Sequence, residues 1–228
     1  MKVPFAAVVT TCTTLAALGT ATVAASSGVA AQGTGGVDLR GIGYDRGNPD
    51  ARIRIVEFAD FACSACSLFA RETMPALERE YILTGIVQWK YVPFILGSFP
   101  NAEPAARAAE CAAEQDAFWS MHDLLYDRQK EWFRTFRPDP ILEGFAKELK
   151  LDLVAFSACY ETNDVASGIA RNNGIAEALY VRATPTFFIN GARVRGALPI
   201  EQFRRIIEMS LRQTSGDEDG RPDRLRRR

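Results

Sequence analysis

Residues 52–66 read RIRIVEFADFACSAC and join three features that bear on the fold. The first half, residues 52–58, is rich in β-branched and aromatic side chains, which is typical of a strand. Two cysteines that are separated by two residues, Cys63 and Cys66, follow it. Residues 67–72 then have the composition of a helix. This order predicts that Cys63 lies where a strand ends and a helix begins.

The expected position of Cys63 has a chemical consequence. A thiol attacks a disulfide only as the thiolate, and the unpaired amides at the start of a helix stabilise an anion. Cys63 is therefore expected to be the exchanging sulfur and Cys66 the resolving one. Two alternatives remain. The pair could be an inert disulfide, or half of a zinc site completed by Cys111 and Cys159, although zinc sites usually contain two closely spaced pairs.

Residues 1–31 differ in composition from the rest of the chain. Lys2 is their only charged residue, and they end in the small residues Gly28-Val29-Ala30-Ala31. This pattern predicts a signal peptide that is cleaved after Ala31, and so an exported protein, periplasmic or otherwise extracytoplasmic. An uncleaved membrane anchor is the alternative.

Cleavage would also change the set of cysteines. It removes Cys12 and leaves four cysteines, an even number, in a compartment where disulfides persist. Because Cys63 and Cys66 are close in sequence, the expected scheme joins them and pairs Cys111 with Cys159.

The overall composition excludes several classes of function. The chain has 27 Lys and Arg against 28 Asp and Glu, and one histidine, His122. Nucleic-acid binding depends on clustered cations, so a nucleic-acid partner is not expected. A single histidine excludes metal sites built from several histidines. We expect neither a metal nor a cofactor.

The rest of the chain alternates between strand and helix patterns. A second strand is expected at 86–94, after a helix interrupted at Pro75, and no further strand before residue 180. Helix-period segments fill the stretch between: 105–116, 118–129, 140–149, 153–162 and 165–178. A hairpin over 186–195, turning at Asn190-Gly191, and a helix over 199–211 follow.

Five segments are similar to those of one known family. They are Gly47-Asn48-Pro49-Asp50-Ala51, Val56-Glu57-Phe58-Ala59-Asp60-Phe61, Cys63-Ser64-Ala65-Cys66, Phe118-Trp119 with His122-Asp123, and Thr184-Pro185-Thr186-Phe187-Phe188-Ile189-Asn190-Gly191. Together they resemble the DsbA-like thiol:disulfide oxidoreductases over residues 40–212. The resemblance implies an α/β protein with a thioredoxin fold and an all-helical insertion.

The domain organisation that we expect combines this resemblance with the leader and the charged C-terminal end. It comprises a signal peptide (1–31), a flexible N-terminal lead-in (32–46), a thioredoxin-like domain (47–101 and 181–213), an inserted helical domain (102–180) and a disordered charged tail (214–228).

The resemblance assigns roles to four further residues. Pro185 matches the family's cis-proline beside the two cysteines, and Thr184 would offer its backbone to an extended substrate segment. Glu57 matches a buried acid that moves the proton of the resolving cysteine, and Lys90 matches its usual partner. As an alternative, Glu57 and Lys90 could both be edge residues that face water.

The chain departs from the family pattern between the cysteines. Strongly oxidising members have proline and histidine there, whereas this chain has Ser64 and Ala65. Without the histidine, the helix end and the Ser64 hydroxyl are left to stabilise the Cys63 thiolate. We therefore expect a less depressed pKa and a less oxidising pair than in those members.

The remaining cysteines and the histidine have simpler interpretations. Cys111 and Cys159 are expected to form a structural disulfide, with a redox relay as the alternative. His122 stands among apolar residues and is expected to be a packed helix residue rather than a catalytic base.

The function that the resemblance implies is an exported dithiol oxidase. Its substrates would be reduced or misoxidised exported proteins, and a membrane quinone-linked thiol oxidase would reoxidise it. The alternatives are a disulfide reductase or isomerase, and a non-enzymatic module that binds peptides or metal beside Pro185.

Overall fold

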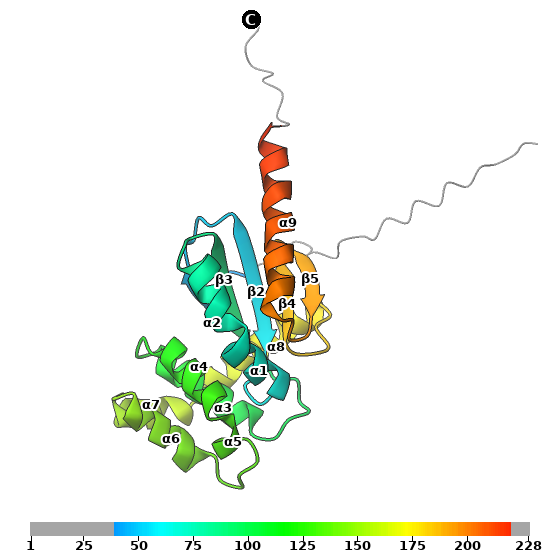
Figure 1. Cartoon of the computed structure of the whole chain (residues 1–228). Helices are drawn as coiled ribbons and strands as arrows, with labels where there is room; N and C mark the ends of the chain where they lie inside the picture. Colours follow the sequence, from blue (N-terminus) through cyan, green and yellow to red (C-terminus); the bar gives the residue numbers. More distant parts are fainter. Residues whose placement is uncertain (1–38, 220–228) are drawn as a thin grey trace, which may run out of the picture. The chain divides into compact units, whose positions relative to one another are not determined.

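The computed structural model describes residues 39–219, in which helices flank a sheet (Figure 1). The expected signal peptide (1–31), the first part of the lead-in (32–38) and the end of the tail (220–228) lie outside the described residues. None of the helices in the described region combines the length and the apolar character needed to span a membrane.

Five strands of the described region form one mixed sheet. They are β1 (Tyr44–Gly47), β2 (Ile53–Ala59), β3 (Val87–Pro93), β4 (Thr186–Ile189) and β5 (Ala192–Arg195). Their order is β1-β3-β2-β4-β5, in which β2 and β3 are parallel and the other neighbours antiparallel. The strand that leads to the cysteines, β2, is therefore in the middle of the sheet.

The helices fall into three groups along the chain. Those between β2 and β3 are α1 (Ser64–Glu72), α2 (Met74–Leu77) and the π-helical turn η1 (Glu78–Ile82). Those between β3 and β4 are α3 (Ala102–Ala113), α4 (Phe118–Asp127), α5 (Gln129–Trp132), α6 (Asp139–Glu148), α7 (Leu153–Tyr160) and α8 (Asn163–Ala178). The last helix is α9 (Ile200–Asp219). The predicted α/β order with a helical insertion is thus present.

Side chains of β2 alternate between the two faces of the sheet, as a strand requires. Ile53 and Ile55 pack in the larger of two core clusters, whereas Phe58 packs in the smaller cluster on the opposite face. Glu57 is two residues from Ile55 and therefore lies on the face of the larger cluster.

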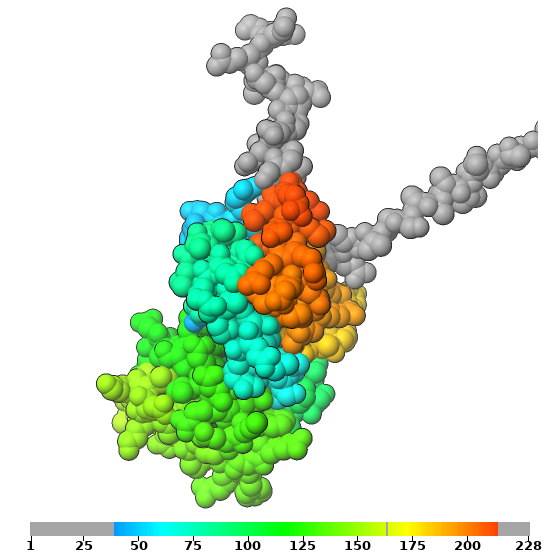
Figure 2. All heavy atoms as spheres, viewed as in Figure 1, coloured from blue at the N-terminus to red at the C-terminus, as the bar shows by residue number. Residues whose placement is uncertain are grey.

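Helices cover both faces of the sheet. Phe69 of α1 and Phe203 of α9 belong to the larger cluster, and Ala176 of α8 belongs to the smaller one. Figure 2 shows the atoms of α9 directly against the segment from α1 to η1, where Arg204 forms an ion pair with Glu80. The cysteine-bearing helix thus packs against the sheet, with α9 on the same face of the sheet.

The helix after the cysteines is interrupted at the expected place. α1 ends at Glu72, and Pro75, which has no amide hydrogen, lies in the first turn of α2. Thr73, between the two helices, donates its hydroxyl to the Leu198 carbonyl (3.2 Å). The interruption is therefore tied to the segment that precedes α9.

The structure corrects the expected lead-in and tail. Residues 44–46, which we expected to be part of a flexible lead-in, belong to β1 (Tyr44–Gly47), because its backbone pairs with the edge of β3. α9 continues to Asp219 and so includes the start of the stretch expected to be disordered. Extending an existing helix is much easier than starting one, so an apolar stripe is not needed in its last turns.

The helical stretch between β3 and β4 is also less uniform than expected. The helix expected over 118–129 is shorter in the structure, because Arg128 leaves helical geometry after α4. A separate helix, α5, begins at Gln129. α8 packs against β3, and Leu179 just after it belongs to the smaller core cluster. α8 therefore helps to cover the sheet, and the division at residues 102 and 180 stays a prediction.

Candidate active site

Cys63 lies directly before α1, as the sequence predicts. Its backbone is extended (φ −78°, ψ 122°), and its carbonyl accepts the first helical hydrogen bond from the Ser67 amide (3.1 Å). Such a residue is the N-cap of a helix, where backbone amides remain without helical partners. Cys63 is only 3% exposed.

Four groups stabilise Cys63 as a thiolate. They lower the pKa of the Cys63 thiol to about 6 against the opposing effect of burial: the Cys66 thiol contributes most, followed by Thr184 and the amides of Cys66 and Ala65. Ser64, whose hydroxyl we expected to contribute, is exposed and is not one of these groups. The resolving cysteine and the helix amides take the place of the family's histidine.

Cys66 has the opposite electrostatic environment. Both cysteines are free thiols here, and Cys66 is fully buried. Burial, then Cys63 and Glu57, raise the pKa of the Cys66 thiol well above its usual value. At neutral pH the pair therefore contains one thiolate, at Cys63, and one thiol, at Cys66. This is the asymmetry that an exchanging and a resolving cysteine require.

Thr184 and Pro185 come from the segment just before β4 and lie beside Cys63. The bond between them is cis, as the resemblance implied. The Cys63 sulfur donates to the Thr184 carbonyl at 3.4 Å. The Thr184 hydroxyl is buried and has no hydrogen-bond partner among the described residues. It is therefore available to the sulfur when Cys63 loses its proton.

Glu57 is a buried acid, not an edge residue that faces water. It is 2% exposed, and burial raises the pKa of its carboxyl to about 8. The nearby Trp89 indole opposes part of this rise, although its N–H lies outside hydrogen-bonding geometry. Because the charge of Glu57 also raises the pKa of Cys66, the two groups share one buried environment.

The predicted pairing of Glu57 with Lys90 is wrong. In the parallel register of β2 and β3, Glu57 is opposite Tyr91, and Lys90 is opposite Val56. The Lys90 side chain therefore lies on the other face of the sheet, where it donates to the Asp45 carboxylate (2.8 Å) and to the Ile42 carbonyl (3.0 Å). No cation is thus supplied to Glu57 by Lys90, which agrees with a raised pKa.

Two tyrosines lie on the Glu57 face of the sheet, and sequence reasoning did not find them. The hydroxyls of Tyr91 and Tyr126 are 2.7 Å apart, and both side chains are buried. Burial raises the pKa of both, and the charges of Glu57 and Cys66 act in the same direction. Both hydroxyls are therefore neutral at neutral pH, and neither supplies a cation to Glu57.

Asp60 and Gln129 are two further buried polar residues that the sequence did not single out. Asp60 accepts hydrogen bonds from the amides of Ala62 (2.9 Å) and Leu96 (3.0 Å), and burial raises its pKa to about 6. Gln129 donates to the carbonyls of Phe61 and Cys63. Both side chains hold the short loop between β2 and α1 in place.

His122 packs in an aromatic cluster, as the sequence analysis expected. Its ring centre is 4.7 Å from that of Tyr91 and 4.9 Å from that of Tyr126. Its Nδ1 is 2.8 Å from the Asp123 carboxylate, and burial lowers its pKa. The ring is thus a neutral packing element of this aromatic cluster.

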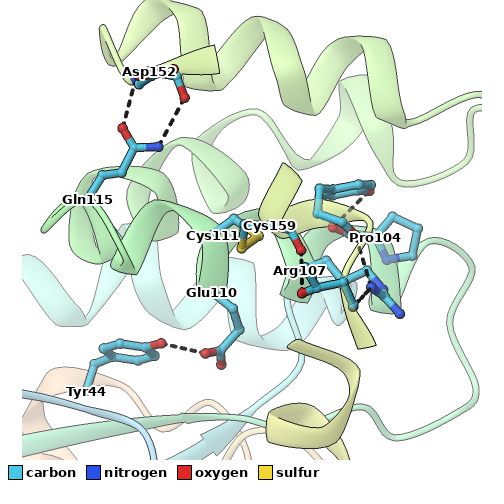
Figure 3. Close-up of a disulfide and its surroundings, with 10 residues drawn as sticks. Tyr44, Pro104, Arg107, Glu110, Cys111, Gln115, Asp152 and Cys159 are labelled. Atoms are coloured by element: carbon cyan, nitrogen blue, oxygen red, sulfur yellow. Dashed lines mark hydrogen bonds between the residues drawn. A yellow bond between two sulfur atoms is a disulfide. The ribbon is translucent and has the colours of Figure 1, made fainter. Parts of the chain in front are cut away.

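Cys111 of α3 and Cys159 of α7 form the expected disulfide (Figure 3), with their Cα atoms 5.7 Å apart. Gln115, which follows the end of α3, exchanges two hydrogen bonds with the backbone of Asp152, just before α7. These bonds join α3 to α7 at two places. Since the disulfide takes up both sulfurs, neither is a thiolate that could complete a four-cysteine zinc site with Cys63 and Cys66.

Removing the disulfide should cost stability without changing the redox pair. Closing a loop of 48 residues stabilises a protein by about 4 kcal/mol in the chain-entropy model. We expect the Cys111→Ala/Cys159→Ala variant to lose about this much free energy of unfolding in urea, while Cys63 is alkylated at the wild-type rate. A variant of wild-type stability with slower exchange would instead identify the disulfide as a relay.

Comparison with known proteins agrees with this geometry. The family model described as Thioredoxin matches residues 43–209. The probable disulfide bond formation protein D of Bacillus cereus is 30% identical over 148 residues, which are 64% of this chain and 68% of that protein. The Na(+)/H(+) antiporter NhaA 3 of Salinispora tropica is 40% identical over 156 residues, 68% of this chain. The chain spans only 23% of the length of that antiporter.

Solved structures share the fold at lower identity. Oxidised BdbD from Bacillus subtilis has a TM-score of 0.67 at 23% identity, covering 75% of this chain and 93% of that one. The alpha-DsbA1 of Wolbachia pipientis has a TM-score of 0.70 at 22% identity, covering 79% and 96%. From its fold, its family model and its relatives, the chain belongs to the thioredoxin family, among the DsbA-like thiol:disulfide oxidoreductases.

Proposed function

We propose that the chain is an exported dithiol oxidase, which donates the disulfide between Cys63 and Cys66 to cysteine pairs of exported proteins. The observation that carries this proposal is the position of Cys63 at the N-cap of α1 beside Thr184, where the Cys66 thiol, Thr184 and the helix amides lower its pKa to about 6. Groups that stabilise the thiolate stabilise the reduced pair, and a stable reduced pair makes the disulfide a stronger oxidant. The export pattern of residues 1–31 supports an extracytoplasmic site of action.

The Cys63 thiolate stabilises the reduced folded protein over a pH range that its lowered pKa determines. The pKa of Cys63 is about 6 in the folded protein and near its ordinary, higher value in the unfolded chain. The thiolate therefore stabilises the reduced folded protein fully above the ordinary pKa of a thiol. The stabilisation is lost as the pH falls through about 6. At pH 7, one unit above the folded pKa, about a third of this stabilisation remains.

The exchange needs two steps at Cys63. A substrate thiolate attacks the Cys63 sulfur, the bond to Cys66 breaks, and Cys66 leaves as a thiolate that takes up a proton. A second thiolate of the substrate then attacks the substrate sulfur that is bonded to Cys63. The bond to Cys63 breaks, and Cys63 leaves as a thiolate. The substrate loses two electrons and two protons, and the cysteine pair of the enzyme becomes reduced.

Glu57 is the group that we assign to the proton of Cys66. With a pKa of about 8, its carboxyl is mostly protonated at neutral pH, and its charge is felt at Cys66. It can give a proton to the leaving Cys66 thiolate and take it back when Cys66 attacks. Lys90 has no part in this step, because it lies on the other face of the sheet.

Thr184 and Pro185 supply the place where the substrate binds. The Thr184 carbonyl is 3.4 Å from the Cys63 sulfur, so an extended segment that pairs with this backbone would bring its own sulfur to Cys63. We propose a membrane thiol oxidase, linked to quinones, as the partner that reoxidises the reduced pair.

A disulfide reductase or isomerase is the second candidate. The dipeptide Ser64-Ala65, which lacks a histidine, favours it. The two functions predict different reduction potentials for the Cys63–Cys66 pair. Strong periplasmic oxidants have potentials of about −120 mV, and thioredoxin has one of about −270 mV.

The proposal is tested by titrating Cys63 and by measuring oxidation. We expect alkylation of the reduced protein to label Cys63, to reach half its maximal rate near pH 6 and to spare buried Cys66. The oxidised protein should restore the disulfides of a reduced test protein in stoichiometric amounts. Alkylation of Cys63 no faster than that of a free thiol peptide at pH 6 would contradict the mechanism. A potential close to that of thioredoxin, with rapid insulin reduction, would favour the reductase.

A further inference from the structure

The loop between β2 and α1 is buried, and two of its carbonyl groups bond to a side chain outside it. The Phe61 carbonyl accepts a hydrogen bond from Gln129 Nε2 at 2.7 Å. The Cys63 carbonyl accepts one from the same nitrogen at 3.1 Å, together with the helical bond from Ser67. One side-chain amide group thus uses both of its N–H donors on the backbone that presents Cys63.

Gln129 reaches this loop from a distant part of the chain. It is the first residue of α5, directly after Arg128, where the chain leaves the geometry of α4. Its side chain is buried, as are the two carbonyl groups that it contacts. A buried carbonyl needs a partner, and in the described residues Gln129 is the side chain that bonds to both.

We infer that Gln129 is a positioning residue of the redox site: by holding the carbonyls of Phe61 and Cys63, it sets the start of α1 so that helix amides point at the Cys63 sulfur. The inference rests on the proposed function only in taking Cys63 as the exchanging thiolate. The amides of Ala65 and Cys66 are among the groups that stabilise this thiolate. Gln129 therefore acts on the sulfur through the backbone and does not contact a substrate.

Other groups around Cys63 would be unchanged when Gln129 is replaced. The titratable groups that act on it are Cys66 of α1 and Asp60 of the loop, with Glu57 of β2 acting on Cys66. Asp60 makes its own bonds, to the amides of Ala62 and Leu96. A change in the titration of Cys63 can thus be attributed to the backbone that Gln129 holds.

The test replaces Gln129 with methionine, which has a similar shape and no donor. Without the two bonds the loop relaxes, and the pKa of Cys63 should rise by about one unit. Since about half of Cys63 is thiolate at pH 6 in the wild type and about a tenth would be in the variant, alkylation at pH 6 should slow about five-fold. Alkylation well above pH 9 should be unchanged.

Gln115 offers a matched control. It also bridges two segments through its side-chain amide, donating to the Asp152 carbonyl (3.2 Å) and accepting from the Asp152 amide (2.8 Å), but it does so beside the disulfide (Figure 3). We expect Gln115→Met to lower the melting temperature and to leave the alkylation profile of Cys63 at wild type.

Two further variants keep the inference falsifiable. Gln129→Leu, which also lacks a donor and adds no charge, should slow alkylation at pH 6 about as much as Gln129→Met. Gln129→Asn, which is too short to reach both carbonyls, serves if either of the others fails to fold. A wild-type profile in any folded variant of Gln129 overturns the inference. Because this titration needs no substrate, its outcome is independent of whether the chain donates or removes disulfides.

Discussion

Replacing Cys63 with serine is expected to lower the rate of disulfide donation at least about 10³-fold, because a hydroxyl cannot form the mixed disulfide. Cys66→Ser should behave differently. It also loses donation, but its Cys63 thiolate can still attack an oxidised substrate, and no resolving thiol remains to release the product. We expect mixed disulfides to accumulate only in Cys66→Ser, as bands on a non-reducing gel that disappear on reduction.

The two variants act as controls for each other. Both change one buried cysteine to serine, so a general loss of structure would affect them alike, whereas trapping requires that the remaining cysteine is Cys63. Trapping by Cys63→Ser instead would reverse the assigned roles. If neither variant trapped a substrate while both retained wild-type far-UV circular dichroism, the exchange chemistry assigned to this pair would be wrong.

Local sequence was sufficient to predict where the two cysteines lie in the fold. Residues 52–66 contain a strand pattern, a cysteine spacing and a helix pattern in direct succession, and each depends on near neighbours. The structure therefore places Cys63 at the start of α1 as predicted, with Cys66 buried behind it. The cis bond before Pro185 was also anticipated, but by family resemblance and not by physical derivation.

The error at Lys90 shows what local sequence does not determine. A strand changes face at every residue, so a difference of one position in the register decides whether a side chain meets Glu57 or lies behind the sheet. The register of β2 against β3 places Tyr91 opposite Glu57. It results from packing across the whole sheet, and the pattern of either strand alone is compatible with both placements.

Contacts made across the helical stretch were out of reach for a similar reason. Gln129 is 68 residues from Phe61, and Tyr126 is 35 residues from Tyr91. A glutamine at the start of a four-residue helix has no distinctive neighbours in sequence. The one available signal was the break between α4 and α5 at Arg128, which a continuous helix pattern over 118–129 concealed.

The second large effect is expected at Glu57, and it concerns stability as well as exchange. The carboxyl titrates near its ordinary pKa in the unfolded chain and near 8 in the folded protein, so folding takes up a proton between these values. The free energy of unfolding should therefore fall as the pH rises through this window, by up to about 5 kcal/mol, and level off above pH 8. Glu57→Gln has no group to ionise and should lose this slope.

Urea unfolding of the oxidised proteins, in which neither Cys63 nor Cys66 titrates, isolates this contribution. Wild type and Glu57→Gln should be similarly stable at pH 5, and the variant should be the more stable protein at pH 8.5. Asp60 titrates in both proteins, so its effect cancels in the difference. Lys90→Gln is the matched control, because it changes the neighbouring strand on the opposite face and should keep the wild-type slope.

Glu57→Gln should also slow disulfide exchange, even though it makes the protein more stable at high pH. Glutamine can neither give a proton to the leaving Cys66 thiolate nor remove one, and proton transfer by a positioned side chain typically contributes about 10²-fold or more. We expect resolution of mixed disulfides to slow by roughly this factor in stopped-flow measurements, with Lys90→Gln unchanged. Resolution at the wild-type rate across pH 5–9 would mean that water reaches Cys66 and that the buried acid has no part in the reaction. A gain in stability coupled to a loss of rate would identify Glu57 as an ionisable group that the fold retains, at a cost in stability, for its use in proton transfer.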